Sequence, residues 1–211
     1  MAHQRSAAGG DGGFTLIEMI VAMSLMAVLI AVFMGGVIQM TKDTSRVQNV
    51  SNSADQARRA YDRFERTARV ASEVNRPVLV GTTWYLEFRT TATGTSTPLC
   101  TQWRMAGGTH LLQRRTWDDV ASPTVSDWET VATGVTDGAS TQQPFTMSPA
   151  DSTYGRQRVA FFLAVTNGSA GSAQVSGLVV ARNTDTTTTT NPDVDGDGIS
   201  DTQVCQQAGR P

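Results

Sequence analysis

Four aspartates near the C-terminus have a spacing that could bind a metal ion. The segment from residue 193 reads DVDGDGISD, which places carboxylates at Asp193, Asp195, Asp197 and Asp201. Alternate carboxylates can surround a hard cation such as Ca²⁺ at about 2.3–2.6 Å, and a glycine among them permits a sharp turn. Without a cation, these charges would repel one another. We therefore predict a calcium site formed by these four side chains and the Ile199 carbonyl oxygen; a disordered acidic turn without metal is the alternative.

A further acidic residue, Glu18, stands at the start of a long apolar segment. From Met19 to Ile38 the sequence has no charged residue, and about 20 apolar residues are what an α-helix needs to cross a bilayer. An ionised carboxylate costs about 2.5–3.5 kcal/mol at the bilayer centre and less near an end, so we expect Glu18 to have a partner. A secretory signal peptide would have a shorter apolar core, and a plain membrane anchor would leave Glu18 unexplained.

The sequence offers little for catalysis or for nucleic-acid binding. His3 is close to the N-terminus, and the other histidine, His110, is expected in a hairpin strand with a structural role. No Ser–His–Asp or Cys–His spacing, P-loop or zinc signature occurs. The net charge of −2 gives no general attraction to nucleic acid. We predict a protein that is not an enzyme and has no direct nucleic-acid partner.

One long helix is expected to carry the N-terminal part of the chain. Beyond the apolar segment, one stripe of apolar and small residues continues at three- and four-residue steps. Its members are Val47, Val50, Ala54, Ala57, Tyr61, Phe64, Ala68 and Ala71. Pro77 cannot sit inside a helix, so we expect the helix to end near Val74. The polar half of this helix needs a sheet to cover its stripe.

The rest of the sequence is expected to form antiparallel strands. Trp84, Leu86 and Phe88 alternate with polar residues, which predicts a strand with one buried face. The pair Gly107–Gly108 predicts a hairpin, because both central residues of the favoured turn need a positive φ. Strands are predicted at residues 84–89, 99–105, 110–117, 159–165 and 175–181, with a short one at 131–135. Residues 159–165 are apolar on both faces, which favours a central position.

The N-terminal residues resemble a known processing signal. Residues 13–18 read GFTLIE and lead directly into the apolar segment, as in type IV prepilins and type II secretion pseudopilins. The resemblance implies that prepilin peptidase, a membrane aspartyl protease, cuts between Gly13 and Phe14 and that the new amine of Phe14 is methylated. It also implies that Glu18 pairs with the Phe14 amine of a neighbouring subunit.

Two further resemblances concern the body and the tail. The order of helix, strand, hairpin and late strand is similar to that of the large minor pseudopilin J and minor pilin W group. This implies an α+β, pilin-like fold, in which a long N-terminal helix with a transmembrane first half packs on an antiparallel β-sheet domain. The aspartate segment resembles thrombospondin type 3-like calcium repeats and the first half of an EF-hand loop, although it lacks the EF-hand glutamate.

The resemblance divides the chain into five segments. These are a leader peptide (1–13), a transmembrane assembly helix (14–40), its amphipathic continuation (41–76), the antiparallel β domain (77–183), and a Thr-rich linker with a calcium-binding-like tail (184–211). It also implies a single pass through the cytoplasmic membrane with the body outside, and later a place in a cell-surface or periplasmic filament. The positive-inside rule alone favours the opposite orientation, because Arg5 precedes the apolar segment whereas Lys42 and Arg46 follow it.

On that outer side, the two cysteines of the chain can oxidise. We predict a disulfide between Cys100 and Cys205, worth about 4.7 kcal/mol in the chain-entropy model for a loop of about 100 residues. Two free buried thiols are the alternative.

We therefore predict a minor pilin or pseudopilin, a non-enzymatic structural subunit. Its partners are prepilin peptidase, the membrane, and other major and minor pilins or pseudopilins that it meets through its N-terminal helix in a type IV pilus or a type II secretion-like pseudopilus. The alternative is a calcium-stabilised cell-surface adhesion domain on a simple single-pass anchor. Cleavage at Gly13 distinguishes the two.

Overall fold

The computed structural model describes residues 13–91, 97–136, 143–167 and 171–210. One helix, α1 (Leu16–Val70), precedes nine strands in this part of the chain. The strands are β1 (Glu73–Val74), β2 (Val78–Val80), β3 (Thr83–Thr90), β4 (Leu99–Ala106), β5 (Leu111–Asp118), β6 (Glu129–Thr133), β7 (Phe145–Ser148), β8 (Arg158–Thr166) and β9 (Ser172–Val180). The chain divides into two compact units, Met1–Ser45 and Arg46–Pro211, and the boundary falls within α1.

The first unit is the apolar part of α1. Its large apolar side chains, from Phe14 to Met40, are exposed on every side of the helix. By length and composition, α1 is the one helix in the described residues that could cross a membrane. A helix that is hydrophobic all round needs an apolar environment on all sides, which agrees with the transmembrane segment expected from the sequence.

The second unit contains the rest of α1, which buries one line of small and aromatic residues. The buried residues are Ser53, Ala57, Ala60, Phe64 and Ala68. The predicted stripe is therefore correct from Ala57 onward but wrong at its start, because Val47 and Val50 are exposed. Gly171, just before β9, approaches Val50 so closely that a side chain at this position would clash with the valine, which nevertheless stays 37% exposed.

The helix ends at Val70, four residues before the predicted end at Val74. Val74 belongs instead to β1 and pairs with Phe88 of β3. The backbone N–H groups of Ser72 and Asn75 donate to the carbonyls of Arg89 and Glu87, at 2.8 and 3.1 Å. Pairing with the edge of β3 thus replaces the last helical turn that the apolar pattern predicted.

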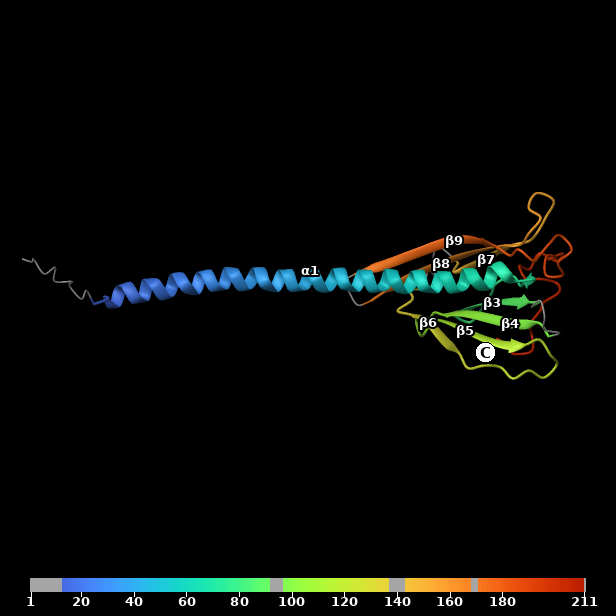
Figure 1. Cartoon of the computed structure of the whole chain (residues 1–211), viewed down its shortest axis with the longest axis horizontal. Coiled ribbons are helices and arrows are strands. Elements are labelled where there is room, and N and C mark those ends of the chain that lie inside the picture. Colours follow the sequence, from blue (N-terminus) through green and yellow to red (C-terminus); the bar gives the residue numbers. More distant parts are fainter. Residues whose placement is uncertain (1–12, 92–96, 137–142, 168–170, 211) are drawn as a thin grey trace, which may run out of the picture. The chain divides into compact units, whose positions relative to one another are not determined.

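Two antiparallel sheets pack on this part of α1. Sheet A has the order β1-β3-β4-β5-β6, with β2 also paired to β3, and sheet B has the order β7-β8-β9. Figure 1 shows β3–β6 along one side of the second half of α1 and β7–β9 along the other. The predicted α+β arrangement, an apolar N-terminal helix with antiparallel sheets, is confirmed, and β8 is the central strand of sheet B as predicted.

Phe64 lies at the centre of the core between the two sheets. Its ring centroid is 5.6 Å from that of Phe88 and 5.4 Å from that of Trp103 in sheet A. On the sheet B side, it stacks on Phe145 and Phe161 at 5.8 and 4.5 Å. One helical residue therefore joins both sheets, and burial of a phenylalanine side chain contributes about 1.5–3 kcal/mol.

The predicted hairpin between β4 and β5 is present, but its turn differs from the prediction. Ala106 pairs with Leu111, so the turn has four residues, and neither glycine has a positive φ. The left-handed residue is His110, at φ +56°, whose Nδ1 lies 3.0 Å from the carbonyl oxygen of Val135. His110 thus lies in the turn and not in a strand, and its ring contacts the segment that follows β6.

Candidate functional site

The start of α1 positions the residues of the expected processing site. Gly13 and Phe14 lie before the helix, and the Phe14 side chain is 81% exposed. Residues 1–12 of the expected leader lie outside the described residues. Both residues that flank the expected cut are therefore accessible and outside regular structure, as a protease requires of its substrate.

Thr15 caps the first turn of α1 and fixes the position of Glu18. The Glu18 N–H lies 3.3 Å from Thr15 Oγ1, and the Met19 N–H donates to the Thr15 carbonyl at 3.2 Å. Thr15 and Glu18 have the spacing of a capping box, in which a carboxylate near the helix N-terminus is also favoured by the helix dipole. Within the described part of this single chain, the Glu18 carboxylate has no hydrogen bond or ion pair, so it is free to bind a group from another molecule.

The outer face of sheet A, away from α1, carries three rows of neighbouring side chains. The register sets Tyr85 beside Arg104 and Gln113, Glu87 beside Gln102 and Arg115, and Arg89 beside Cys100 and Trp117. The sequence predicted an exposed face for β3, but Tyr85 and Glu87 are fully buried. The C-terminal tail (residues 184–210) covers Glu87, whose carboxylate binds Arg210, a residue more than a hundred positions later in the chain.

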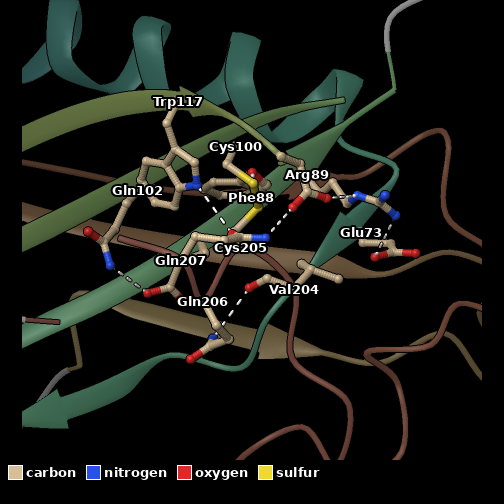
Figure 2. Close-up of a disulfide and its surroundings, with 12 residues drawn as sticks. Glu73, Phe88, Arg89, Cys100, Gln102, Trp117, Val204, Cys205, Gln206 and Gln207 are labelled. Carbon is tan, nitrogen blue, oxygen red and sulfur yellow. Dashed lines mark hydrogen bonds and ion pairs between the residues drawn. A yellow bond between two sulfur atoms is a disulfide. The ribbon is translucent and has the colours of Figure 1, made fainter. Parts of the chain in front are cut away.

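A disulfide between Cys100 of β4 and Cys205 attaches the tail to this face. The two Cα atoms are 5.6 Å apart, and the bond joins residues separated by 105 positions. Figure 2 shows the bond with Trp117 and Gln207 on one side and Arg89 and Glu73 on the other. This is the pairing proposed from the sequence, and it is buried with Trp117 in a small cluster of its own.

A buried ion pair holds the tail a few residues beyond the disulfide. Arg210 donates from Nε and Nη2 to the two carboxylate oxygens of Glu87, at 2.9 and 2.7 Å. Gln102 and Asn75 each donate a further hydrogen bond to the same carboxylate, at 2.9 and 3.0 Å. Each carboxylate oxygen of Glu87 thus accepts from two donors, which is what an ionised carboxylate needs when it is removed from water.

The beginning of the tail is anchored by Gln157, a fully buried residue just before β8. Its side-chain amide accepts from the Val74 N–H at 3.0 Å and donates to Thr190 and Asn191, both at 2.9 Å. Its own N–H donates to Thr184 at 2.8 Å. The threonine-rich segment expected to be a linker is therefore bonded to the domain at both of its ends.

The aspartate loop, residues 193–201, lies between two fixed points of the tail: Asn191, which Gln157 binds, and Cys205, which the disulfide holds. Oxygens of Asp193, Asp195 and Asp197 all lie within 4.8 Å of one another. Gly196 and Gly198 have φ values of +73° and +82°, which turn the backbone so that the side chains converge. The structure thus brings together three of the four aspartates singled out from the sequence.

Asp201 and Ile199 form hydrogen bonds within the same loop. The two Asp201 oxygens each lie 3.2 Å from the Val194 N–H, and the Asp201 N–H donates to the Pro192 carbonyl at 3.0 Å, which closes the loop. Ile199 donates its N–H to Asp197 at 2.7 Å. Arg76 Nε lies 3.6 Å from one oxygen of Asp193 and offsets part of the negative charge.

Sequence reasoning missed Glu87, Arg210 and Gln157. A signal for the first two existed: once Cys205 is bonded to β4, Arg210 must lie near the outer face of the neighbouring strand, where Glu87 is the acidic residue. Gln157 had no such signal, because its partners are a strand end and three polar tail residues.

Comparisons with known proteins bear on the start of the chain. Residues 10–34 match the prokaryotic N-terminal methylation motif. Neither curated proteins nor solved structures give a significant match to the chain. The matched residues include Gly13, Phe14 and Glu18, and together with the apolar helix they support a membrane-anchored subunit of the pilin or pseudopilin type.

Proposed function

We propose that this protein is a minor pilin or pseudopilin, a non-enzymatic subunit that is inserted in the membrane and assembles through α1 into a filament. The observation that carries the proposal is the methylation motif over residues 10–34, which includes the cleavage junction and Glu18. The body follows the order of elements expected for the large minor subunits, which favours the J and W group within this class.

Cleavage between Gly13 and Phe14 would leave a mature chain whose amine stands two residues before α1. The capped first turn holds Glu18 close to that N-terminus, and its carboxylate has no partner within the described part of the chain. In an apolar setting, an ion pair to the Phe14 amine of a neighbouring subunit would be far stronger than in water. Assembly would therefore supply the partner that Glu18 lacks among the described residues of a single chain.

Mass spectrometry of the protein extracted from membranes tests the proposal. We expect a chain that begins at Phe14 and carries one added methyl group. Gly13→Trp should abolish cutting, because a bulky side chain blocks the backbone from the peptidase. Gly9→Trp, which places the same bulk in the leader outside the motif, should still be cut. An uncut wild-type chain in cells with active prepilin peptidase would favour the adhesion domain on a simple anchor.

We further propose that the aspartate loop binds Ca²⁺ through Asp193, Asp195, Asp197, Asp201 and the Ile199 carbonyl. The residues fit this ion: three carboxylates converge, and Asp193 Oδ1 is buried without a hydrogen-bond partner among the described residues. Calcium takes 6–8 oxygen ligands, so carboxylates and a carbonyl are suitable donors. The ion would neutralise the repulsion within the loop and fix the tail between Gln157 and Cys205.

Melting of the full chain in detergent, with calcium and with chelator, tests this site. A ligand that binds only the folded state stabilises by about 2.7 kcal/mol at a hundredfold excess over its dissociation constant. Asp195→Asn with Asp197→Asn should erase the difference between the two conditions. Asp55→Asn with Asp62→Asn, which removes two exposed carboxylates from α1, should leave it unchanged. If calcium alters neither melting nor protease sensitivity of the tail, the loop is an acidic turn only.

A further inference from the structure

Two arginines on the outer face of sheet A differ from the other arginines of its strands. Arg89 pairs with Glu73 and Asp119, and Arg114 pairs with Glu129. Arg104 and Arg115 have no carboxylate within ion-pair distance among the residues that the structure describes. In the described part of a protein whose net charge is −2, these two cations therefore form no direct ion pair, although the nearby Glu87 carboxylate raises the pKa of Arg115.

A tryptophan holds these two arginines in place. The guanidinium carbons of Arg104 and Arg115 lie 3.9 and 4.4 Å from the ring centroid of Trp128, just before β6. Both distances are within the range of a cation–π contact. We call these three partly exposed residues, Arg104, Arg115 and Trp128, the Arg–Trp patch.

The remaining contacts of the two arginines separate their roles. Arg115 donates to the carbonyls of Ala208 and Gly209 at 3.1 and 2.9 Å, so it helps to hold the tail. Arg104 has one hydrogen bond, from Nε to the Gln113 side chain at 2.9 Å. Its two terminal nitrogens have no partner within the described chain. Holding the tail thus explains Arg115 but not Arg104.

The proximity of two like charges makes the patch favourable for an anion. Burial lowers the pKa of Arg115, and the neighbouring Arg104 charge lowers that pKa further. An anion between the two guanidiniums would turn this repulsion into attraction. An arginine fork matches a carboxylate with two parallel hydrogen bonds, and both guanidiniums already lie against the Trp128 ring.

We propose that the Arg–Trp patch is a docking surface for a protein partner that presents clustered carboxylates. Arginine and tryptophan are the residues that most often dominate the binding energy of protein interfaces. Single-stranded nucleic acid fits less well, because it stacks its bases on free aromatic faces, and two guanidiniums already lie over the Trp128 ring. The partner would bind the globular body, a role separate from assembly through α1.

Binding of labelled peptides to the full chain in detergent, followed by fluorescence anisotropy at low ionic strength, tests the patch. The probe is a peptide of alternating glutamate and serine, and its comparison is the same peptide with glutamine. We expect the glutamate peptide alone to bind. Arg104→Gln should weaken it on the order of tenfold, the effect of one charged hydrogen bond. The affinity of Arg104→Lys should lie between those of the wild type and Arg104→Gln, since lysine keeps the charge but cannot form two parallel hydrogen bonds.

Arg66→Gln provides the matched control, because it removes the same charge from the exposed side of α1. Trp128→Phe keeps a ring under the arginines and should weaken binding less than Arg104→Gln. The proposal is overturned if the wild type does not bind the glutamate peptide, or if Arg104→Gln and Arg66→Gln bind it equally. Tighter, Arg104-dependent binding of oligodeoxythymidylate would replace the protein partner by a nucleic acid. None of these outcomes depends on cleavage at Gly13.

Discussion

Apolar segments are usually buried and polar segments usually exposed, but the apolar half of α1 and the polar C-terminal tail show the opposite. Residues 16–40 are strongly apolar, yet their side chains are exposed within the chain, and Glu18 has no partner in its described part. The tail is polar and rich in threonine and aspartate, yet it is fixed by a disulfide, a buried ion pair and the bonds of Gln157.

The difference shows that the two regions obtain their stabilising contacts from different sources. The helix requires partners outside the chain, because lipid and neighbouring helices must cover its surface. The tail finds its partners within the domain, through specific bonds that composition does not reveal. Perturbing the tail should therefore change the free energy of unfolding, whereas perturbing the helix start should change assembly and leave that free energy unaltered.

Loss of the disulfide should have the largest effect on stability. Cys100→Ala with Cys205→Ala should lower the free energy of unfolding by up to about 4.7 kcal/mol, the chain-entropy value for a loop of about 100 residues. Denaturant unfolding of the full chain in detergent measures it. A reducing agent should destabilise the wild type and leave the variant unchanged, since the chain has no other cysteine. Equal stability of both proteins would show that the tail is held without the bond.

Breaking the buried ion pair should have an effect of similar size. Arg210→Gln leaves the Glu87 charge buried, and removing one partner of such a pair costs about 3–5 kcal/mol. Adding Glu87→Gln should restore part of the loss, because the orphaned charge is then removed. The matched control is Arg69→Gln, which breaks the exposed pair with Glu65 and should cost at most about 1 kcal/mol. Equal losses for the two arginines would contradict the role of Glu87 as a buried anchor.

A pH titration should reveal a smaller contribution from the contact between α1 and β6. The hydrogen bond from Arg63 lowers the pKa of Glu129, and a second hydrogen bond from Arg114 lowers it further. Because the pKa of Glu129 is lower in the folded state, its contribution is present above the unfolded pKa of about 4.3 and is lost as pH falls through the folded pKa. The Glu129 side chain is 46% exposed, so we expect less than about 1 kcal/mol.

The measurement is the difference in unfolding free energy between wild type and Arg63→Gln at neutral and at acidic pH. That difference should shrink at acidic pH, when Glu129 is protonated in both proteins. Arg66→Gln, one turn away on the exposed side of α1, should show no such change. A difference that is constant with pH would mean that Arg63 acts through packing alone.

Glu18→Gln should have the smallest effect on stability and a large effect on assembly. The carboxylate has no partner in the described chain, so the unfolding of residues 46–211 should be unchanged. Incorporation into the proposed filament, measured by co-purification with its other subunits, should fall because the proposed ion pair to the neighbouring amine is lost. Ser24→Ala, another polar change in the same helix, should incorporate normally. Normal incorporation of Glu18→Gln would remove the proposed role of this residue.

The parts of the fold that local patterns determine were predictable from the sequence. The uncharged segment after Glu18 specifies an all-round apolar helix, and the alternation in residues 99–105 and 110–117 specifies a paired hairpin. Residues 159–165 are apolar on both faces and form the central strand of sheet B. Each of these patterns reflects burial that is decided within one element and its immediate neighbours.

The parts that failed depend on segments distant in the sequence. Val74 has helical spacing, but the edge of β3 offers it hydrogen bonds that a helix end cannot match. Glu87 stands in an alternating strand and has the pattern of an exposed residue, until a tail more than a hundred residues later covers it. At the candidate sites, the junction at Gly13 and the aspartate spacing were visible in the sequence, whereas the buried anchors of the tail were not.

The position of Cys205 after every strand sets the order of events during synthesis. Cys100 is made with β4, but its partner follows 105 residues later, when all strands of both sheets have already emerged. Contacts between such distant residues form late in folding. Until then, the tail cannot cover the Cys100 thiol or the Glu87 carboxylate. Closure of the bond therefore follows the synthesis of every described strand, and until then Cys100 carries a free thiol.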